Sequence, residues 1–244
     1  MTGPVPAPRG ETRTRVKICG LCRPADVRAA ALAGADYLGF VFAPSPRRAE
    51  LELAPELEPL GPGGPSRVGV FVLPQASAEP AADRAAAAQA AREMAAIARA
   101  FRLDFLQLHG RLTPALAGAI RAEIDLPWIL AVRAGEDDPR SALAAEPFAL
   151  LFDTPHPSGR GGGSGTTFDW ELAQPWRSQS RLFLAGGLAP GNVGQAIDRV
   201  QPFAVDVASG VETSPGEKSA DAIAKFVAAV RAADRARPPA PERT

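Results

Sequence analysis

The stretch RLFLAGGLAPGNVGQAIDRVQPFAVDVASG, residues 181–210, decides the fold of this chain. An apolar run at 181–186 is followed by a segment of helical character at 190–200 and by a second apolar run at 203–209. Two such runs joined by a helix are typical of a parallel β–α–β unit, because parallel strands need a long crossover connection. Glycines lie at the end of both runs, so each predicted strand leads into a tight turn.

The same alternation continues outward through the chain. Short apolar or β-branched runs predict eight strands, at 15–19, 36–42, 67–73, 104–109, 127–132, 148–153, 181–186 and 203–209. Helical segments lie in the gaps and after the last strand, with Asp83, Thr113 and Ser219 as expected N-caps. The second, fifth and sixth gaps are weaker, because they are short or rich in proline and glycine.

Eight successive β–α units have the order and size of a TIM barrel. A doubly wound open sheet is the alternative that the pattern leaves open. We predict an α/β fold with a single (β/α)8 TIM barrel at residues 15–234. Pro, Gly, Arg and Thr dominate residues 1–14, and three prolines interrupt residues 235–244, so both ends are expected to be disordered tails.

The composition limits the possible partners. The chain has 244 residues, with 27 Lys and Arg against 27 Asp and Glu, and two cysteines. Balanced charge provides no global field for nucleic acid or an anionic membrane, so we expect a small-molecule partner. No apolar run could form a signal-peptide core or span a bilayer, and two cysteines are no disulfide framework. We therefore expect a soluble protein of the cytoplasm, with no membrane or nucleic-acid partner.

A TIM barrel carries its chemistry at the C-terminal ends of its strands. Nearly every reactive side-chain type in the core of this chain falls at such an end or in the loop after it. These residues are Cys19, Arg47, Arg48, His109, Asp153, Gly186, Gly187, Asp206, Ser209 and Gly210. The clustering favours an enzyme.

The loops after the seventh and eighth strands predict a phosphate site. Gly186 and Gly187 precede a helix, and Ser209 and Gly210 follow the last strand. Backbone N–H groups at glycines can approach a phosphate closely, and a helix N-terminus favours negative charge. The alternative is that the glycines only permit tight turns.

Asp153 and Cys19 are the candidate acid and base. A carboxyl group at the rim of an apolar strand can be held protonated by desolvation, although a capping or turn aspartate is the common alternative. A thiolate at the end of the first strand could act as a base or a nucleophile. Asp206 lies within its strand and is a weaker candidate acid, the alternative being that it only orients loops. His109 is either a pocket residue or a core histidine, and we expect both Asp206 and His109 in the substrate pocket.

The pair Cys19 and Cys22 permits other interpretations. A redox pair would be expected in a smaller thioredoxin-like fold with a W-C-G-P-C-like context, which is not found. Zinc could be held by Cys19, Cys22, His109 and His156, but these residues are scattered and the histidines lack paired spacing, so we expect no metal. Arg47 and Arg48 suit a carboxylate, which a guanidinium group grips with two hydrogen bonds.

Several motifs together resemble the phosphoribosylanthranilate isomerase family, TIM-barrel enzymes of tryptophan biosynthesis. They are VKICG (16–20), GFVFAPSPRR (39–48), LQLHG (106–110), LLFDT (150–154), GGSGTTFDW (162–170), LAGGLAPGNV (184–193) and FAVDVASGVETSPGEK (203–218). The resemblance implies an Amadori rearrangement of N-(5-phosphoribosyl)anthranilate to 1-(2-carboxyphenylamino)-1-deoxyribulose 5-phosphate.

The resemblance also implies roles for individual residues. Asp153 would protonate the furanose ring oxygen, and Cys19 would remove the proton from the second sugar carbon of the resulting Schiff base. The family has an arginine after the second strand, which would hold the anthranilate carboxylate. An ungapped spacing from that strand maps it to Arg48, whereas the Ser-Pro-Arg motif would map it to Arg47. We expect Arg48. Neither step calls for a metal or an organic cofactor. Cys22 is expected to be incidental.

Two alternatives stay open beside the isomerase. One is another phosphate-binding barrel enzyme acting on a related sugar phosphate. The other is a non-catalytic barrel whose C-x-x-C binds a metal or responds to redox conditions. The expected assembly is a monomer or a homodimer.

Overall fold

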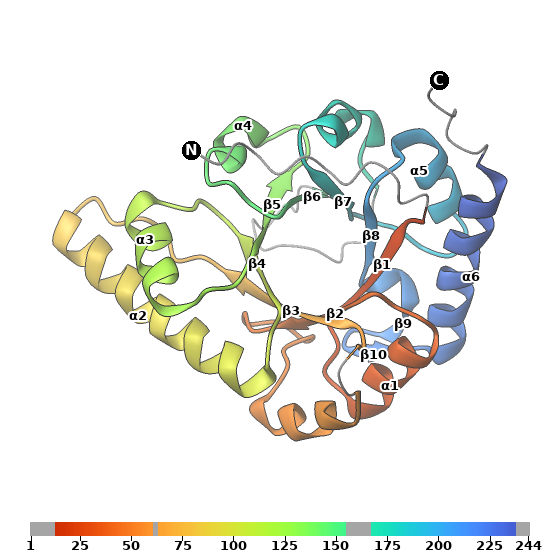
Figure 1. The fold of residues 1–244 in the computed structure, drawn as a ribbon, viewed down its shortest axis with the longest axis horizontal. Coiled ribbons are helices and arrows are strands. Elements are labelled where there is room, and N and C mark those ends of the chain that lie inside the picture. The colour runs from red at the N-terminus through yellow and green to blue at the C-terminus, as the bar shows by residue number, and fades with distance from the viewer. Residues whose placement is uncertain (1–12, 61–62, 155–166, 238–244) are drawn as a thin grey trace.

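The computed structural model describes residues 13–60, 63–154 and 167–237. Its eight parallel strands form a closed barrel surrounded by helices (Figure 1). The strands are β1 (Arg15–Cys19), β2 (Tyr37–Val41), β3 (Ser66–Val72), β4 (Phe105–His109), β5 (Trp128–Arg133), β6 (Ala149–Asp153), β7 (Arg181–Leu184) and β8 (Ala204–Val207). The barrel closes where β1 pairs with β8, with Ile18 opposite Val207. The predicted TIM barrel is confirmed, and the open sheet is excluded.

The regular helices lie in the gaps with the strongest helical pattern. They are α1 (Pro24–Leu32), α2 (Pro80–Phe101), α3 (Pro114–Glu123), α5 (Val193–Val200) and α6 (Ala220–Ala236). The hydroxyl groups of Thr113 and Ser219 cap α3 and α6 by accepting from backbone N–H groups, each at 3.2 Å. The predicted cap at Asp83 is wrong, because α2 already begins at Pro80 and Asp83 lies in its first turn.

The described parts of the three weak gaps contain short or tightly wound elements. They are the 3-10 helix η1 (Leu51–Leu60), the five-residue helix α4 (Pro139–Leu143), and the 3-10 helices η2 (Trp170–Leu172) and η3 (Gln174–Ser178). Prolines within or beside these segments remove backbone donors, which explains why no long α-helix forms there.

The barrel interior has two layers of different chemistry. Aromatic rings fill its lower part, with centroids 4.8 to 6.2 Å apart among Tyr37, Phe105, Phe148, Phe183 and Phe203. Inward positions nearer the C-terminal ends of the strands carry the buried polar side chains Lys17, Gln107 and Asp206. The aromatic layer therefore closes the barrel from below, and the polar layer forms the floor of a cavity above it.

Beyond β8 the chain forms the 3-10 turn η4 (Ser209–Val211) and a small hairpin of β9 (Glu212–Ser214) and β10 (Glu217–Lys218). Of the predicted tails, only residues 13–14 and 235–237 belong to the described part. There Thr14 is buried, and its N–H and hydroxyl groups donate to Asp234 in α6. None of the described helices is both long and apolar enough to cross a membrane.

Candidate active site

A cavity of about 590 Å³ opens at the C-terminal mouth of the barrel, within the usual size range of small-molecule sites. Most predicted site residues line it together: Cys19, His109, Asp153, Gly186, Gly187, Asp206 and Ser209. Seven of the eight strands or their following loops contribute to the lining. Residues far apart in the sequence therefore meet around one space.

Lys17 is the buried cation at the base of this cavity. Its side chain is 0% exposed, and its Nζ donates to Asp206 Oδ1 at 2.9 Å. Burial opposes the ammonium charge, but Asp206 and Cys19 outweigh it and raise the pKa of Lys17 above its ordinary value. Lys17 is consequently a charged ammonium inside the barrel, ion-paired with Asp206.

Gly39 on β2 lets Lys17 approach Cys19. A Cβ atom at Gly39 would lie 2.9 Å from both Lys17 Nζ and Cys19 Sγ, so these two atoms are separated by no more than twice that distance. Burial raises the pKa of the Cys19 thiol, and the ammonium of Lys17 opposes this shift. Any larger residue at position 39 would displace the thiol, the ammonium or both.

Asp153 is a weak acid tuned toward neutrality. Burial, reinforced by the negative charge of Asp206, raises the pKa of Asp153 to about 6. The Thr154 N–H, which donates to Asp153 Oδ1 at 2.8 Å, and the charge of Lys17 limit this shift. At pH 7 roughly a tenth of the Asp153 carboxyl groups are therefore protonated and able to donate a proton, far more than for an ordinary aspartate.

His109 is a neutral polar group in this cavity. Burial and the nearby charge of Lys17 lower the pKa of His109 to about 4. Its Nε2 lies 2.7 Å from Gln107 Nε2, so the uncharged ring accepts a hydrogen bond there. Gln107 Oε1 is buried and has no hydrogen-bond partner in the part of the chain that the structure describes. A ligand donor could satisfy it.

The loops after β7 and β8 form one wall of the cavity. Gly186 and Gly187 both have positive φ, at 77° and 62°, a conformation that favours glycine. Asn192 holds this loop, because its Oδ1 accepts from Ala189 N at 2.8 Å and its Nδ2 donates to Gly187 O at 2.9 Å. Gly210, also predicted for the phosphate site, lies behind this wall. It is not among the lining residues, and a Cβ there would overlap the Leu188 carbonyl.

The comparisons with known proteins agree with this geometry. Residues 84–229 match the family model described as N-(5'-phosphoribosyl)anthranilate (PRA) isomerase. An N-(5'-phosphoribosyl)anthranilate isomerase from Thiobacillus denitrificans is 42% identical over 222 residues, covering 89% of this chain and 98% of that protein. The chain belongs to the phosphoribosylanthranilate isomerase family.

Solved structures of the family extend the likeness to three dimensions. The phosphoribosyl anthranilate isomerase of Thermotoga maritima has a TM-score of 0.73 and 38% identity, covering 90% of this chain and 99% of that one. A further structure, with a TM-score of 0.69 and 35% identity over 90% of this chain and 99% of that chain, is a phosphoribosyl anthranilate isomerase in complex with reduced 1-(o-carboxyphenylamino)-1-deoxyribulose 5-phosphate.

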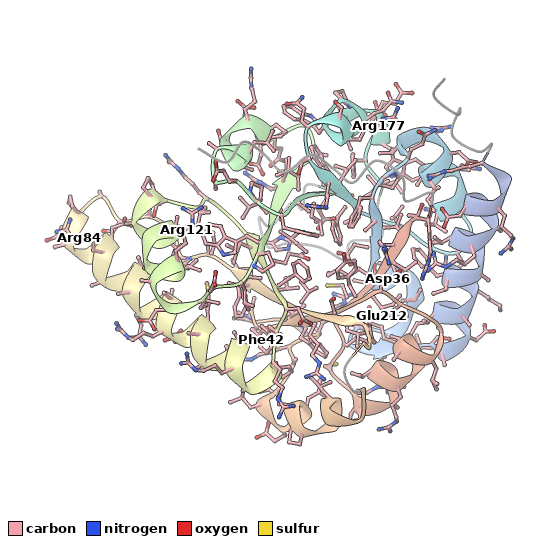
Figure 2. The ribbon with its side chains drawn as sticks, in the orientation of Figure 1. Asp36, Phe42, Arg84, Arg121, Arg177 and Glu212 are labelled. Atoms are coloured by element: carbon pink, nitrogen blue, oxygen red, sulfur yellow. The ribbon has the colours of Figure 1, made fainter. Side chains whose placement is uncertain are left out.

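Arg47 and Arg48 differ sharply in this member of the isomerase family. Arg47 lines the cavity, and its Nε and Nη2 donate to the two carboxylate oxygens of Glu212 at 2.9 and 2.7 Å. Figure 2 labels Glu212, which Lys218 Nζ also contacts at 2.7 Å. Arg48 is not among the lining residues; its side chain is 52% exposed and lies 3.7 Å from Glu50. The structure thus places Arg47 at the cavity, not the expected Arg48.

Cys22 lies outside the cavity of this isomerase fold. Its Sγ donates to the carbonyl of Gly216 at 3.0 Å, in the hairpin of β9 and β10, and both cysteines are free thiols. In the described residues, no group of three or more His, Cys, Asp and Glu side chains could hold a metal ion. His156, the fourth residue considered for zinc, lies outside the described residues.

Sequence reasoning missed four residues that shape this isomerase site: Lys17, Gly39, Gln107 and Glu212. Lys17 and Gln107 each lie two positions before a recognised residue, Cys19 and His109, and so share its face of the strand. The two-residue period of a strand could therefore have indicated that Lys17 and Gln107 point into the same space as Cys19 and His109. Nothing in the local sequence of Gly39 or Glu212 indicated a partner distant in the chain.

Proposed function

We propose that this chain catalyses the Amadori rearrangement of N-(5-phosphoribosyl)anthranilate to 1-(2-carboxyphenylamino)-1-deoxyribulose 5-phosphate in tryptophan biosynthesis. One observation carries the proposal beyond family membership. A carboxylic acid with a pKa of about 6, Asp153, and a thiol beside a buried ammonium, Cys19, line the same cavity. An acid and a base in one cavity are what an aldose-to-ketose isomerisation requires.

In the first step Asp153 donates its proton to the furanose ring oxygen, and the bond from that oxygen to C1 breaks. The nitrogen lone pair forms a C1=N iminium ion, which makes the proton on C2 acidic. The Cys19 thiolate then removes this proton, and the electrons of the C–H bond form a C1=C2 enaminol. Protonation of C1 and loss of the O2 proton give the ketone, so the net reaction is an isomerisation.

The substrate has two anionic ends, and the cavity offers a partner for each. We assign the phosphate to the wall of Gly186, Gly187 and Ser209, where positive-φ glycines allow close approach of backbone N–H groups. We assign the anthranilate carboxylate to Arg47. Two of its nitrogens are engaged by Glu212, and its Nη1 has no partner among the described residues.

The sugar hydroxyl groups would lie between these anchors, near the polar floor. Asp206 and neutral His109 line this region, and Gln107 Oε1 there lacks a partner in the described part of the chain. A hydroxyl donor on the substrate would satisfy that buried oxygen, which stabilises the complex. This assignment uses no metal or organic cofactor.

The experiment is the loss of anthranilate-type fluorescence when freshly made phosphoribosylanthranilate is mixed with the protein. Wild type and Cys22→Ser should both consume substrate well above the uncatalysed background. Cys19→Ser and Asp153→Asn should lose most of this turnover, typically about 10²–10⁴-fold for removal of a general acid or base. A wild type no faster than background would refute the function, and an equally inactive Cys22→Ser would refute the assignment of the base.

The two neighbouring arginines provide a matched pair for the carboxylate assignment. Arg47→Gln should raise the KM for phosphoribosylanthranilate by about 10-fold or more, since a charge-assisted hydrogen bond is lost. Glu212 would still be paired with Lys218, so the loop should keep its structure. Arg48→Gln removes the same charge one residue away and should leave KM unchanged. The reverse pattern would return the carboxylate to Arg48.

The assembly and location of the protein are part of the same proposal. We propose a monomer or a homodimer; one related structure from Thermotoga maritima is described as mutually generated monomers of a dimeric enzyme. Sedimentation velocity across a range of concentrations distinguishes the two states. A cytoplasmic location is supported by two free thiols, and fractionation of the producing cells tests it.

A further inference from the structure

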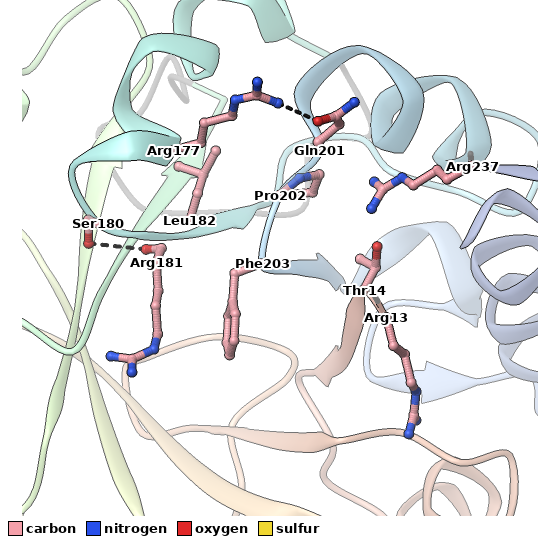
Figure 3. A pocket seen from close by; sticks show the side chains of 10 residues that line it. All are labelled: Arg13, Thr14, Arg177, Ser180, Arg181, Leu182, Gln201, Pro202, Phe203 and Arg237. Carbon is pink, nitrogen blue, oxygen red and sulfur yellow. Dashed lines mark hydrogen bonds between the residues drawn. The ribbon is translucent and has the colours of Figure 1, made fainter. Parts of the chain in front are cut away.

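A second cavity, of about 240 Å³, lies at the opposite, N-terminal end of the barrel (Figure 3). It lies beside the starts of β7 and β8, the residues before β1 and the end of α6. No residue lines both this N-terminal cavity and the candidate active site. The two cavities are therefore separate spaces at opposite ends of the barrel.

The lining of the N-terminal cavity is strongly basic. Four of its ten lining residues are arginines, and no Asp or Glu of the described chain is among them. The arginines are Arg13, Arg177, Arg181 and Arg237. In a chain whose charges balance overall, this is a local concentration of positive charge around a hollow.

Two of these charges have no carboxylate partner among the described residues. Arg177 Nη1 donates to a neutral acceptor, Gln201 Oε1, at 2.6 Å (Figure 3). The guanidinium of Arg181 lies over aromatic rings, 4.5 Å from the centroid of Phe148 and 5.9 Å from that of Phe203. Ring contacts fix the position of a guanidinium group but do not neutralise it.

Arg237 is only partly compensated, whereas Arg13 is paired. Arg237 Nη1 lies 3.9 Å from Asp234, whose carboxylate already accepts from Thr14, and its Nη2 donates to the Ile197 carbonyl. Its Nε is buried without a partner in the described part of the chain. Arg13 Nη2, in contrast, lies 3.2 Å from Asp36. Three of the four arginines thus keep unmatched positive charge or donors.

We propose that the N-terminal cavity binds a small anion carrying one or two phosphate groups. Planar guanidinium groups match the geometry of phosphate oxygens, and partial burial reduces screening by solvent. The cavity volume is below the roughly 300 Å³ at which sites for drug-sized ligands begin, so a nucleotide would not fit within it. A pyrophosphate-sized ion fits both the volume and the charge.

The direct test is titration calorimetry of the full chain with pyrophosphate at low ionic strength. Sodium chloride at equal ionic strength controls for screening, because general charge attraction falls with salt regardless of the anion. The reduced product analogue named above is added first, so that the candidate active site is filled. Wild type should still bind pyrophosphate saturably under these conditions.

Three arginine variants identify the binding site. Arg177→Gln alters an exposed rim residue and should weaken binding about tenfold, the usual effect of losing one charge-assisted hydrogen bond. Arg181→Gln should weaken it at least as much, with thermal unfolding measured in parallel because its ring contacts are also lost. Arg84→Gln removes an exposed arginine of α2, remote from Arg177 in Figure 2, and should bind like wild type.

The outcomes separate clearly. Binding weakened about tenfold or more in Arg177→Gln and Arg181→Gln, with wild-type binding in Arg84→Gln, supports the site. Equal weakening in all three variants would show only general charge attraction. Complete displacement of pyrophosphate by the reduced product analogue would assign it to the active site, and absence of saturable binding would overturn the proposal. Turnover of Arg177→Gln should equal that of wild type, so failure of this proposal leaves the isomerase function untouched.

Discussion

The buried ammonium of Lys17 should control the reactivity of Cys19, and Lys17→Met tests this. The substitution replaces the ammonium with an uncharged chain of similar length and leaves the cavity lining otherwise intact. In the wild type, Lys17 opposes the rise in the Cys19 pKa that burial causes. Without Lys17 the charge of Lys218 still opposes this rise, but the larger opposing effect is lost, so the pKa of Cys19 should rise further.

The size of the effect follows from the proximity of the two groups. An opposite charge within several ångströms typically shifts a pKa by about 1–3 units, so the thiolate fraction below the pKa should fall about 10- to 1000-fold. Turnover should fall by a similar factor. The folded protein also loses one partner of a buried ion pair, which costs about 3–5 kcal/mol of an unfolding free energy of about 5–15 kcal/mol.

The assay is alkylation of Cys19 by iodoacetamide between pH 7 and 11, in a Cys22→Ser background so that only one thiol reacts. The midpoint of the rate against pH reports the pKa of Cys19. A second variant, Lys17→Met with Asp206→Asn, removes both charges of the pair. It should regain stability in thermal unfolding, whereas alkylation of Cys19 should recover only in part because the ammonium is still missing.

A folded Lys17→Met protein with an unchanged midpoint for Cys19 would refute the electrostatic role. Lys17 would then be a packing and ion-pair residue only, and the loss of activity would follow stability. Full recovery of alkylation in the double variant would lead to the same conclusion. A shifted midpoint together with restored stability in the double variant would separate reactivity from folding.

The pH dependence of turnover should be flat-topped, because Asp153 must be protonated, with a pKa of about 6, and Cys19 ionised, with a pKa above the ordinary value of 9. At a pH between the two pKa values, only roughly one molecule in 10³ or fewer has Asp153 protonated and Cys19 ionised at the same time. The measurement is kcat/KM from pH 5 to 10. Folding raises the pKa of Asp153, so the folded state binds more protons than the unfolded chain between about pH 4 and pH 6, and stability falls as the pH rises through that interval. Asp153→Asn should therefore be more stable than wild type by about 3 kcal/mol at pH 7.5, seen as a higher unfolding temperature, and should lose that advantage near pH 4. Cys22→Ser should change stability by no more than the roughly 1 kcal/mol of one hydrogen bond, and a larger loss by denaturant titration would contradict its peripheral placement. Gly210→Ala should destabilise the protein by about 1–3 kcal/mol, because its Cβ overlaps a carbonyl of the β7–α5 loop, whereas Gly191→Ala, with nothing within 4 Å, should not; equal melting temperatures would disprove the close approach.

The barrel was predictable because its signal is repeated. Eight apolar runs with helical segments between them permit few topologies once right-handed crossovers are required. The weak gaps were also readable from proline content, as the 3-10 helix at 51–60 shows. The position of Asp83 was not readable, because a proline three residues earlier offered an equally good first turn and the helix begins there.

The polar floor was less accessible to sequence reasoning. Lys17 lies between two apolar neighbours in a run that reads as a buried strand, and a lysine is rarely buried without a partner. That partner, Asp206, is contributed by the last strand and becomes a neighbour only when β8 closes against β1. The sequence of either strand therefore contains only one partner of the ion pair. The opposite charge that allows each group to be buried is present only in the closed barrel.

The choice between Arg47 and Arg48 shows why loop residues resist such reasoning even when strands do not. The backbone of Arg48 bridges to Val41 at the end of β2, and the N–H of Ala49 donates to the Val41 carbonyl at 2.8 Å. The chain thus returns to the strand at Arg48, while Arg47 packs its side chain over Gly20, where a Cβ would lie 2.8 Å from Arg47 Cδ. A shift of one residue in this turn would exchange the two side chains. Which arginine reaches the cavity is therefore decided by the backbone of one short loop and by a glycine on a different strand end, and counting residues from the strand cannot supply either.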